Sequence, residues 1–500
     1  MKSNHVFDQN AWIFISIYLG SLILVGFLSY RARQENTLKD FYLAGNGFGL
    51  VVIFLTLYAT QYSGNTLFGY SGKTYRIGYA WIMSVHFMTA IVACFLIYAP
   101  RLYARARQFN YITPTDYLQH RFNSNWINVV ATLIMIVVLS NYLLAQLMAM
   151  GRAMQGMSMA DPDTAYQQGV ILLTLIMVIY GTLGGIRAVA WTDVIQGLVL
   201  MTGFMVLLFM LYKQFGSLSL ATTTIQQSHD IAKVNVPVAN RLREWFSYII
   251  IVGLGSTLYP QAIQRIYAAR SEKVLRQGLA LMAFAPLFTS LIAVITGIYA
   301  IAYVPGLEGT ASDQVLGIIL SIIQQNSILG YWLVVILYAA ILAAMMSTAD
   351  SALLSISSML SKDIYGRFVD ANASEAKLTL LGKIFSWCLI IFLVWLAIYL
   401  SDKTSLLKLL DRKFDLLIQL VPAFMLSIHW RGMQAFPTFI GLVAGVLLSL
   451  FLAYGGFDFV QNGKVFGFHP GLIGLVINII IAVIGSVWSN KTSVITQVRY

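Results

Sequence analysis

Small polar side chains recur along one long apolar segment in the last third of the chain. They lie in AAILAAMMSTADSALLSISSMLSKDIY at offsets 0, 3, 4, 7, 11 and 14, namely Ala344, Ser347, Thr348, Ser351, Ser355 and Ser358. These offsets fall on one face of an α-helix. Hydroxyl oxygens on such a face can line an aqueous path for a cation, or they can hydrogen-bond neighbouring helices. Asp350 lies beside the row, and a carboxylate in an apolar segment indicates function because its burial is costly.

A second apolar segment turns polar halfway along its length. LYATQYSGNTLFGYSG, residues 57–72, contains Gln61, Ser63, Gly64 and Asn65 but no charged residue, and GLGSTLYPQ, residues 253–261, interrupts another apolar segment. A helix can break inside a membrane only where the break is buried in protein or lines a cavity. Such a break exposes carbonyl oxygens that can coordinate a cation. The alternative is that Ser63 and Gly64 only allow helices to pack closely.

A carboxylate also occurs in YGTLGGIRAVAWTDVIQG, residues 180–197. Asp193 lies there just inside an apolar segment, with Thr192 beside it and Gln196 one turn further on. One interpretation is a helix-start carboxylate that the N-terminal dipole stabilises. The other is a carboxylate that binds or couples a cation. Gly181 and Gly185 form a GxxxG pattern, which indicates helix packing more often than function.

A solute site near the middle of the membrane would draw on uncharged polar side chains. The candidates are Gln61, Ser63, Gly64, Asn65, Asn141, Gln146, Ser256, Tyr259, Gln261 and Gln419, with Pro422 at a predicted helix distortion. Each of them could instead hydrogen-bond a neighbouring helix. Arg412 and Lys413 stand between Asp411 and Asp415, which favours a self-paired outer cluster; attraction of an anionic solute is the alternative.

Membrane-spanning helices must position these residues. The chain has 500 residues, of which 58% are hydrophobic and 10% charged, against roughly 25% charged in soluble domains. Apolar stretches near the spanning length of about 20 residues are predicted at 11–30, 47–70, 77–100, 125–150, 166–185, 190–212, 245–263, 277–303, 330–357, 380–400, 409–429, 434–454 and 470–488. The sequence therefore predicts an all-α integral membrane protein with about thirteen transmembrane helices.

The loops and interruptions predict how these spans are organised. Lys and Arg concentrate in the loops on one side, which places the N-terminus outside and the C-terminus inside. Two interrupted spans five apart predict a five-plus-five inverted repeat. The expected divisions are 1–40 with helix 1, 41–213 with helices 2–6, an external connector at 214–243 with a short helix, 244–430 with helices 7–11, and 431–500 with accessory helices 12 and 13.

Other functional classes find little support in the sequence. The net charge of +12 is spread over loops that flank spans, which favours membrane topology over nucleic-acid binding. Cys94 and Cys388 lie inside predicted spans, and the six His residues are far apart, so neither a disulfide framework nor a metal cluster is expected. No paired catalytic motif is present, so we expect neither an enzyme activity nor a cofactor.

Three stretches together resemble one family. YGTLGGIRAVAWTDVIQ resembles the signature of the sodium:solute symporter family, which includes proline, pantothenate, monocarboxylate, sialic acid and sodium/glucose transporters. AAILAAMMSTADSALLSISSMLSKDIY resembles its sodium-site helix, and LYPQAIQRIYAARS resembles its seventh span and following loop. The resemblance covers nearly the whole chain. It implies a five-helix inverted-repeat fold, as in leucine-type amino-acid transporters, with alternating access driven by the sodium gradient.

The resemblance also implies site residues. The main sodium site would use the carbonyls of Ala59, Tyr62 and Ala344 and the hydroxyls of Ser347 and Thr348. The spacing of the last three independently puts them on one helix face. Some members bind a second sodium nearer the cytoplasm through the carboxylate at the position of Asp193, with a structural or gating carboxylate as the alternative.

One departure from the family bears on the solute. Proline-transporting members carry an aspartate where Gln61 stands, so this chain keeps hydrogen-bonding capacity there but loses the charge. The pattern SGNTLFGYSGKTYRIGYAW is closer to pantothenate- and monocarboxylate-type members. This points to a solute that bears a carboxylate.

The sequence thus leads to a functional hypothesis and one alternative. We expect a secondary-active symporter in the inner (plasma) membrane that imports sodium with a small organic solute such as pantothenate, a monocarboxylate or an amino acid such as proline. The alternative is a transporter-like sensory module that signals through a partner protein. A kinase on the same chain is disfavoured because about a dozen residues follow the last predicted span.

Overall fold

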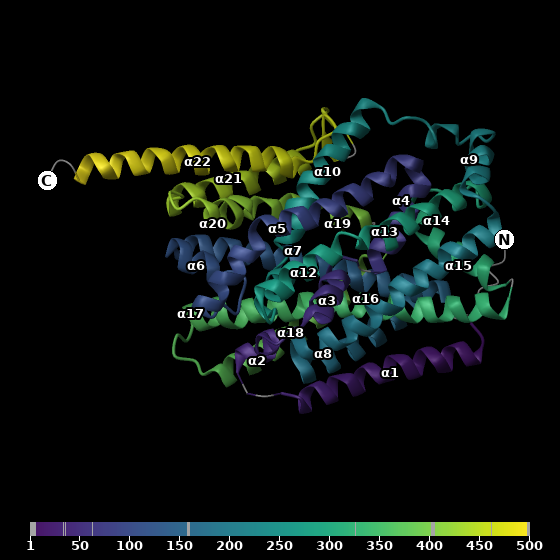
Figure 1. The fold of residues 1–500 in the computed structure, drawn as a ribbon, viewed down its shortest axis with the longest axis horizontal. Helices are drawn as coiled ribbons and strands as arrows, with labels where there is room; N and C mark the ends of the chain where they lie inside the picture. Colours follow the sequence, from purple (N-terminus) through teal and green to yellow (C-terminus); the bar gives the residue numbers. More distant parts are fainter. Residues whose placement is uncertain are drawn as a thin grey trace.

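The computed structural model describes residues 7–33, 35, 37–62, 64–157, 161–325, 327–401, 406–461 and 463–497, with the backbone alone at 64, 65, 156, 157, 310, 406–411 and 491–497. These residues form an elongated bundle of helices (Figure 1). The described strands are β1 (Val460–Gln461) and β2 (Lys464–Val465), a short antiparallel hairpin that the all-α prediction did not include.

The helices of the first half occupy the spans predicted in that half. They are α1 (Gln9–Arg31), α2 (Leu38–Leu43), α3 (Leu50–Gln61), α4 (Gly64–Ile77), α5 (Met83–Phe109), α6 (Asp116–Phe122), α7 (Asn125–Met157) and α8 (Pro162–Phe215). The predicted connector contains α9 (Leu218–Gln226), the short helix expected there.

The second half begins after this connector. Its helices are α10 (Ala239–Thr257), α11 (Pro260–Ala268), α12 (Glu272–Met282), α13 (Ala285–Phe288), α14 (Ser290–Tyr303), α15 (Val315–Gln324), α16 (Ile328–Ser358), α17 (Gly366–Phe368), α18 (Glu375–Tyr399), α19 (Leu406–Leu417), α20 (Ser427–His429), α21 (Ala435–Tyr454) and α22 (Pro470–Gln497). A π-helical turn, Pro422–Leu426, lies at the predicted distortion.

Nine helical stretches among the described residues are long and apolar enough to cross a membrane, or ten if the bent pair α10–α11 counts as one span. This number is lower than thirteen partly because α8 counts as one stretch, although the two predicted spans 166–185 and 190–212 meet in it at the kink at Gly185. The predicted span 277–303 is instead divided among α12, α13 and α14. The number thirteen, the inverted repeat and the outside position of the N-terminus stay predictions.

Gly185 is the point where α8 turns. Its φ of 59° and ψ of −152° belong to a region that only glycine adopts readily. A Cβ atom built there would lie 2.5 Å from the carbonyl oxygen of Phe41 on α2. The glycine therefore permits both the bend in α8 and the close approach of α2.

Substituting Gly185 with Ala is expected to destabilise the protein by about 1–3 kcal/mol, because the backbone conformation becomes strained and the new methyl group meets the Phe41 carbonyl. The thermal midpoint of the purified protein measures this loss. Gly20→Ala on α1 is the matched control, since a Cβ there meets nothing within 4 Å. Equal midpoints for the two variants would contradict this role of Gly185.

Both predicted helix breaks are present. α3 ends at Gln61 and α4 begins at Gly64, while α10 and α11 meet at an angle of 51°. Pro260 stands at the start of α11, a position that proline favours because its missing N–H would be unsatisfied there anyway. Backbone hydrogen bonds join the residues just before α3 to the end of α11. Phe48 N–H donates to the Ala268 carbonyl at 3.1 Å, and Arg270 N–H donates to the Phe48 carbonyl at 2.9 Å.

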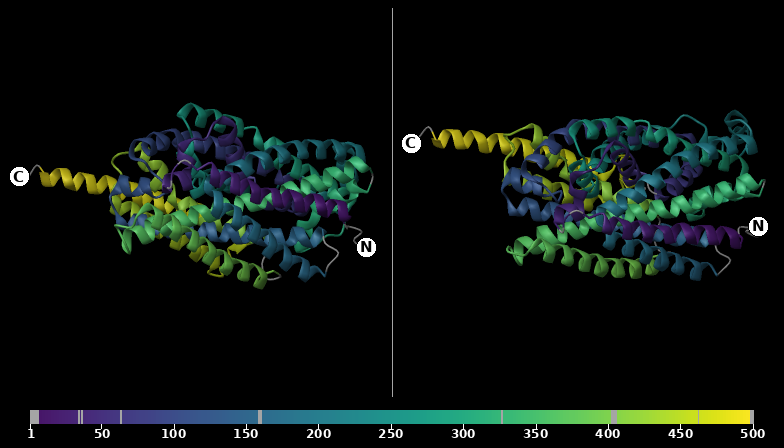
Figure 2. Two further views of the ribbon diagram at one scale, coloured as in Figure 1. Left: turned by 90° about the horizontal axis from the view of Figure 1, so that it is seen from below. Right: turned by 60° about the horizontal axis from the view of Figure 1, so that its bottom comes forward.

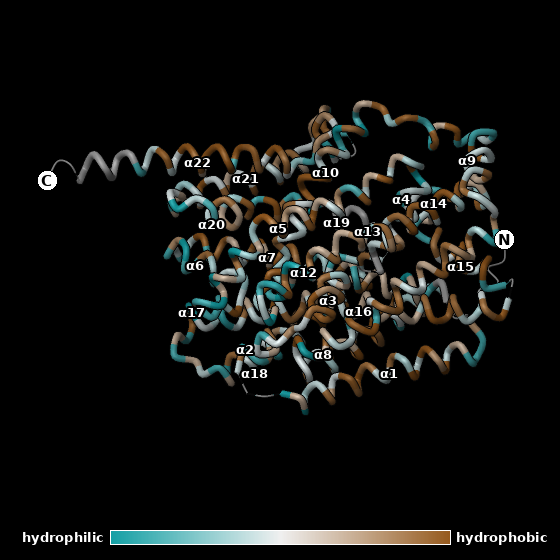
Figure 3. Tube along the Cα trace, in the orientation of Figure 1, coloured by the Kyte–Doolittle hydropathy of each residue, from teal (hydrophilic) through white to brown (hydrophobic). Residues whose placement is uncertain are grey.

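The bundle has an apolar middle and two polar ends (Figure 3). Large apolar side chains such as Ile17, Phe209 and Ile391 are more than half exposed on its outer surface, as expected of side chains that face lipid. The start of α1 and the end of α22 lie at opposite ends of the bundle in each view (Figure 2).

Candidate functional site

Oxygen atoms from α3 and α16 meet beside the first helix break. The Thr348 hydroxyl lies 3.1 Å from the Ala59 carbonyl oxygen and 2.8 Å from the Ala344 carbonyl oxygen. Tyr62, another predicted ligand, is the residue at which α3 stops: its φ of −112° and ψ of 84° are not helical. We refer to the Ala59 and Ala344 carbonyls and the Thr348 hydroxyl as the oxygen cluster; Tyr62 stays a predicted ligand at the end of α3. Oxygens of this kind can replace the water around a small cation.

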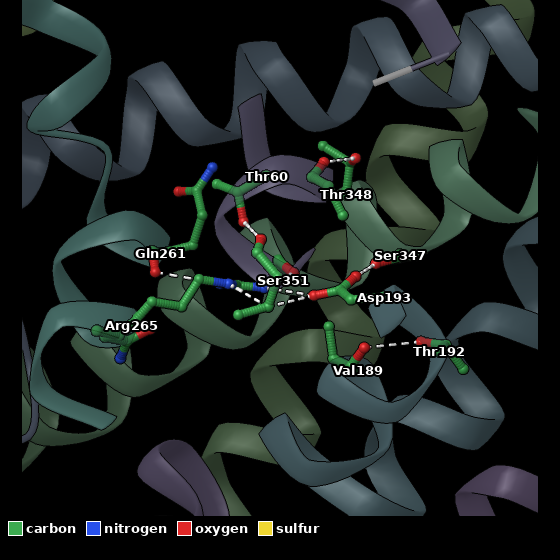
Figure 4. Close-up of polar contacts among 12 residues, drawn as sticks. Thr60, Val189, Thr192, Asp193, Gln261, Arg265, Ser347, Thr348 and Ser351 are labelled. Carbon is green, nitrogen blue, oxygen red and sulfur yellow. Dashed lines mark hydrogen bonds and ion pairs between the residues drawn. The ribbon is translucent and has the colours of Figure 1, made fainter. Parts of the chain in front are cut away.

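Ser347 is directed to a different partner. Its hydroxyl donates to the Asp193 carboxylate of α8, and Figure 4 shows the Thr348 hydroxyl directed away from that carboxylate. The next hydroxyls of the row also bond helices: Ser351 accepts from Arg265, while Ser355 and Ser358 bond the Gln264 amide. In this structure Ser347, Ser351, Ser355 and Ser358 all hydrogen-bond neighbouring helices. The role of Ser347 as a sodium ligand stays a prediction.

A buried ion pair lies immediately next to the oxygen cluster. Arg265 of α11 and Asp193 of α8 are fully buried, and Arg265 Nη2 lies 3.2 Å from Asp193 Oδ2. Thr56 of α3 donates to the same carboxylate and accepts from Arg265 Nε at 2.7 Å. Arg265 Nη1 donates to the Gln261 carbonyl at 3.1 Å, and Nη2 also donates to Ser351 at 2.7 Å. The pair therefore joins α3, α8, α11 and α16 (Figure 4).

The position of Asp193 corrects one sequence interpretation. The residue lies about two turns beyond the kink at Gly185, where the second helical part of α8 begins. The effect of the N-terminal dipole falls off within the first turn, so it does not explain Asp193. Arg265 falls just beyond the predicted span 245–263, so the sequence placed it in the loop that follows. It lies instead in α11 with 0% exposure. An intramembrane carboxylate needs a partner, so Asp193 indicated that some cation is buried beside it, but not which Lys or Arg that cation is.

A second carboxylate lies close to this pair. Asp350 on α16 is 1% exposed, and its Oδ2 atom has no hydrogen-bond partner among the described residues. A Cβ atom added to Gly181 would collide with this carboxyl group. The GxxxG pattern thus serves packing at its first glycine, where it makes room for Asp350, and bending at its second, Gly185.

A small cavity lies beside the two helix breaks. Its volume of about 50 Å³ holds a few water molecules, so a solute can enter only when its walls move. Three predicted solute residues line it, namely Gln61, Ser256 and Tyr259. Gln61 Nε2 donates to the Ser256 carbonyl at 3.3 Å across the two breaks.

Four other predicted solute residues whose side chains are described, Asn141, Gln146, Gln261 and Gln419, do not line this cavity. Gln419 bonds the carbonyls of Asp415 and Gly471 and the hydroxyl of Ser449, which anchors α21 and α22. Asn141 and Gln146 lie on α7 outside the lining. Gln261 is fully buried, and its amide atoms have no hydrogen-bond partner among the described residues.

Three further predicted residues fall at the first break. Ser63 lies outside the described residues, and Gly64 and Asn65 are described by their backbone alone.

The charged cluster on α19 is divided. Arg412 pairs with Asp415 at 2.9 Å, as expected of a self-paired cluster. Lys413 is 3% exposed and lines the cavity. The sequence did not separate the two cations, because their different environments depend on how α19 is rotated against its neighbours.

Comparison with known proteins identifies the family. The model of the sodium:solute symporter family matches residues 41–445. The chain belongs to this family. Sodium/proline symporters of Staphylococcus aureus strains JH9 and NCTC 8325 are each 26% identical over 506 aligned positions, which cover 97% of this chain and 94% of each relative.

Solved structures agree on the fold of this family member. A sodium-coupled sialic acid symporter in a substrate-bound outward-open state superposes with a TM-score of 0.77 at 22% identity, covering 96% of this chain and 98% of its own. A nucleobase-cation-symport-1 transporter in a closed conformation gives a TM-score of 0.52 at 12% identity, covering 90% and 95%. The fold is therefore of the leucine-transporter type. Family membership supports sodium-coupled solute import across a membrane as the activity.

Proposed function

We propose that this protein imports a small organic carboxylate together with sodium across the plasma membrane by alternating access. Sodium would bind in the oxygen cluster, and the solute would bind in the adjoining cavity. The observation that carries the proposal is the meeting of the Ala59 and Ala344 carbonyls with the Thr348 hydroxyl at the break between α3 and α4.

The chemistry of the oxygen cluster supports a monovalent cation. Carbonyl and hydroxyl oxygens carry partial charges only, and no carboxylate belongs to the cluster as defined. Dedicated calcium sites in proteins usually include carboxylates. In contrast, unwound carbonyls at a broken helix coordinate sodium in transporters of this architecture.

The arrangement of the oxygen cluster and the cavity supports coupling between them. Ala59 and Tyr62 belong to the end of α3, and Gln61 between them lines the cavity. A cation that holds the Ala59 and Tyr62 carbonyls would therefore also fix the backbone that carries Gln61. Sodium binding would in this way prepare the solute site.

Asp193 takes a coupling role in this proposal. Arg265 supplies the positive charge that a second sodium ion would otherwise bring to the carboxylate. The pair joins α3 and α11, one half of each broken helix, to α8 and α16. In alternating access these helices must move relative to one another when the protein opens to the cytoplasm, so the pair would hold the cytoplasmic side closed.

Uptake into proteoliposomes tests the proposed activity. We expect a sodium gradient to drive accumulation of at least one carboxylate from a panel of pantothenate, lactate, pyruvate and proline. Equal gradients of lithium or potassium should drive much less, because the cluster's spacing selects among monovalent ions. Protein-free vesicles with the same gradients are the control. Uptake that is equal in sodium, lithium and potassium would contradict the proposal.

A further inference from the structure

The end of α16 carries two charged residues that have no part in the sodium or solute site. A π-helical turn, Met359–Tyr365, continues the helix and contains Lys362 and Asp363 of the sequence SKDIY. Turns of this kind are rare and often occur at functional sites. Asp363 is 0% exposed, and a carboxylate can be buried in this way only if hydrogen bonds or a cation compensate it.

Both oxygens of the Asp363 carboxylate bind the loop between α5 and α6, residues 110–115. Thr113 donates its hydroxyl to Oδ1 at 3.0 Å, and Thr115 donates its hydroxyl to Oδ2 at 2.8 Å. Both threonines are fully buried. Hydrogen bonds to an ionised acceptor are roughly twice as strong as neutral ones. If the loop moved away from α16, the carboxylate would lose both donors, so the two can separate only when water enters to replace them.

Lys362 strengthens the same contact. Its Nζ atom pairs with Oδ2 of Asp116, the first residue of α6. That oxygen also accepts the backbone N–H groups of Ile112 and Thr113 at 2.7 and 3.0 Å. The Asp116 carboxylate therefore fixes the conformation of the loop, while Lys362 fixes the position of the loop against α16.

The loop lies against the end of α11, one half of a broken helix. Tyr267 Oη of α11 lies 3.4 Å from the Pro114 carbonyl oxygen, and Gln264 Nε2 lies 3.5 Å from the Ile112 carbonyl oxygen. The Gln264 amide also bonds two hydroxyls of α16. An outward movement of α11 would therefore have to displace the loop from α16.

We propose that Asp363 acts as a latch: it holds the loop 110–115 against α11, and the protein opens to the cytoplasm only when this contact is released. The predicted topology puts both the loop and the end of α16 inside. The inference rests on the proposed alternating access but on no particular solute. Asp363 is a positioning residue, about three turns along α16 from Ser351, which bonds Arg265.

Amide hydrogen exchange of the full-length protein tests the latch, together with sodium-driven uptake of pantothenate, lactate, pyruvate and proline. Asp363→Asn keeps the size of the side chain and removes its charge. A second variant, Thr113→Val with Thr115→Val, removes the two donors from the other side of the contact. Asp370→Asn is the matched control, because Asp370 also follows α16 but is 33% exposed and pairs with Lys377.

We expect Asp363→Asn to speed amide exchange in the loop 110–115 and in α11 about tenfold, the effect of losing one hydrogen bond to a charged group. The threonine variant should do the same, and combining the two should add little, because both remove one contact. Half-maximal uptake should require several times more sodium, because a smaller share of the protein faces outward. Asp370→Asn should change neither quantity.

Two outcomes would overturn the latch. One is unchanged exchange in Asp363→Asn. The other is faster exchange confined to the loop 110–115, with α11 and the sodium requirement as in wild type, because the contact would then hold only the loop. If Asp363→Asn folds poorly, the threonine variant decides between these outcomes. Wild-type protein that accumulates none of the solutes in response to sodium would overturn the proposed function instead, while the exchange of α11 still decides the latch.

Discussion

The variant Arg265→Met is expected to lose most of its stability and transport, because it leaves the Asp193 carboxylate charged and fully buried without its cation. Removing one partner of a buried ion pair costs about 3–5 kcal/mol. Arg265 also donates to Thr56, Ser351 and the Gln261 carbonyl, so these acceptors lose a partner in the same substitution. The thermal midpoint and the folded yield of purified protein measure the effect.

A double-substitution cycle separates the ion pair from packing. Adding Asp193→Asn to Arg265→Met removes the stranded charge and should recover much of the lost stability, which appears as a coupling energy between the two sites. Arg276→Met is the matched control, since Arg276 pairs with Glu272 at 2.7 Å while both are about half exposed. Such exposed pairs contribute about 0–1 kcal/mol. Additive effects at Asp193 and Arg265 would contradict the account of this pair.

The variant Thr348→Ala is expected to need much more sodium for half-maximal uptake, by roughly tenfold or about 1.4 kcal/mol. The substitution removes the hydroxyl that lies between the Ala59 and Ala344 carbonyls and leaves both helices in place. The maximal rate at saturating sodium should fall less than the apparent sodium affinity. Uptake measured over a series of sodium concentrations separates the two.

Thr296→Ala supplies the control for this experiment. Thr296 is also a fully buried threonine, but its hydroxyl donates to Ile292 of its own helix, α14, at 2.8 Å. Thr296→Ala therefore removes the same atoms as Thr348→Ala but leaves the oxygen cluster unchanged. A sodium requirement that is the same in both variants would argue against Thr348 as a sodium ligand.

The broken helices could be predicted because their cause is local. Polar residues and glycine at 61–65 and 253–261 interrupt apolar runs, and the chain breaks near both places. The helical spacing of Ala344, Ser347 and Thr348 likewise correctly places them on one face. Within that face, sequence alone did not decide which hydroxyl turns toward α3 and which toward α8. Ser347 and Thr348 are adjacent, yet they bond different helices.

The two buried cations could not be predicted because their environments are tertiary. Arg265 follows an apolar run and is indistinguishable in sequence from the cations that flank spans. It is buried because α11 lies against α3 and α16, where Thr56 and Ser351 receive its guanidinium. Lys413 likewise stands beside Arg412 in one charged cluster. Only the rotation of α19 sends Lys413 to Tyr142 and Arg412 to Asp415.

The predicted solute residues illustrate the same limit. Gln61 and Tyr259 stand at the helix breaks and line the cavity, as expected of residues near a broken helix. Gln419 has the same chemistry, but it lies where α19 meets α21 and α22 and bonds them. A polar residue in a membrane helix thus signals a partner, and the packing of helices decides whether that partner is a solute or another helix.

Equilibrium binding in detergent tests the coupling of sodium to solute most directly. The affinity for a radiolabelled carboxylate such as pantothenate is measured with and without sodium, and the affinity for radioactive sodium with and without the carboxylate. The account predicts that each ligand tightens the other by the same factor, about 5–150-fold for typical coupling energies, and that Thr348→Ala reduces this factor. A solute that binds with the same affinity in sodium and in choline would contradict it.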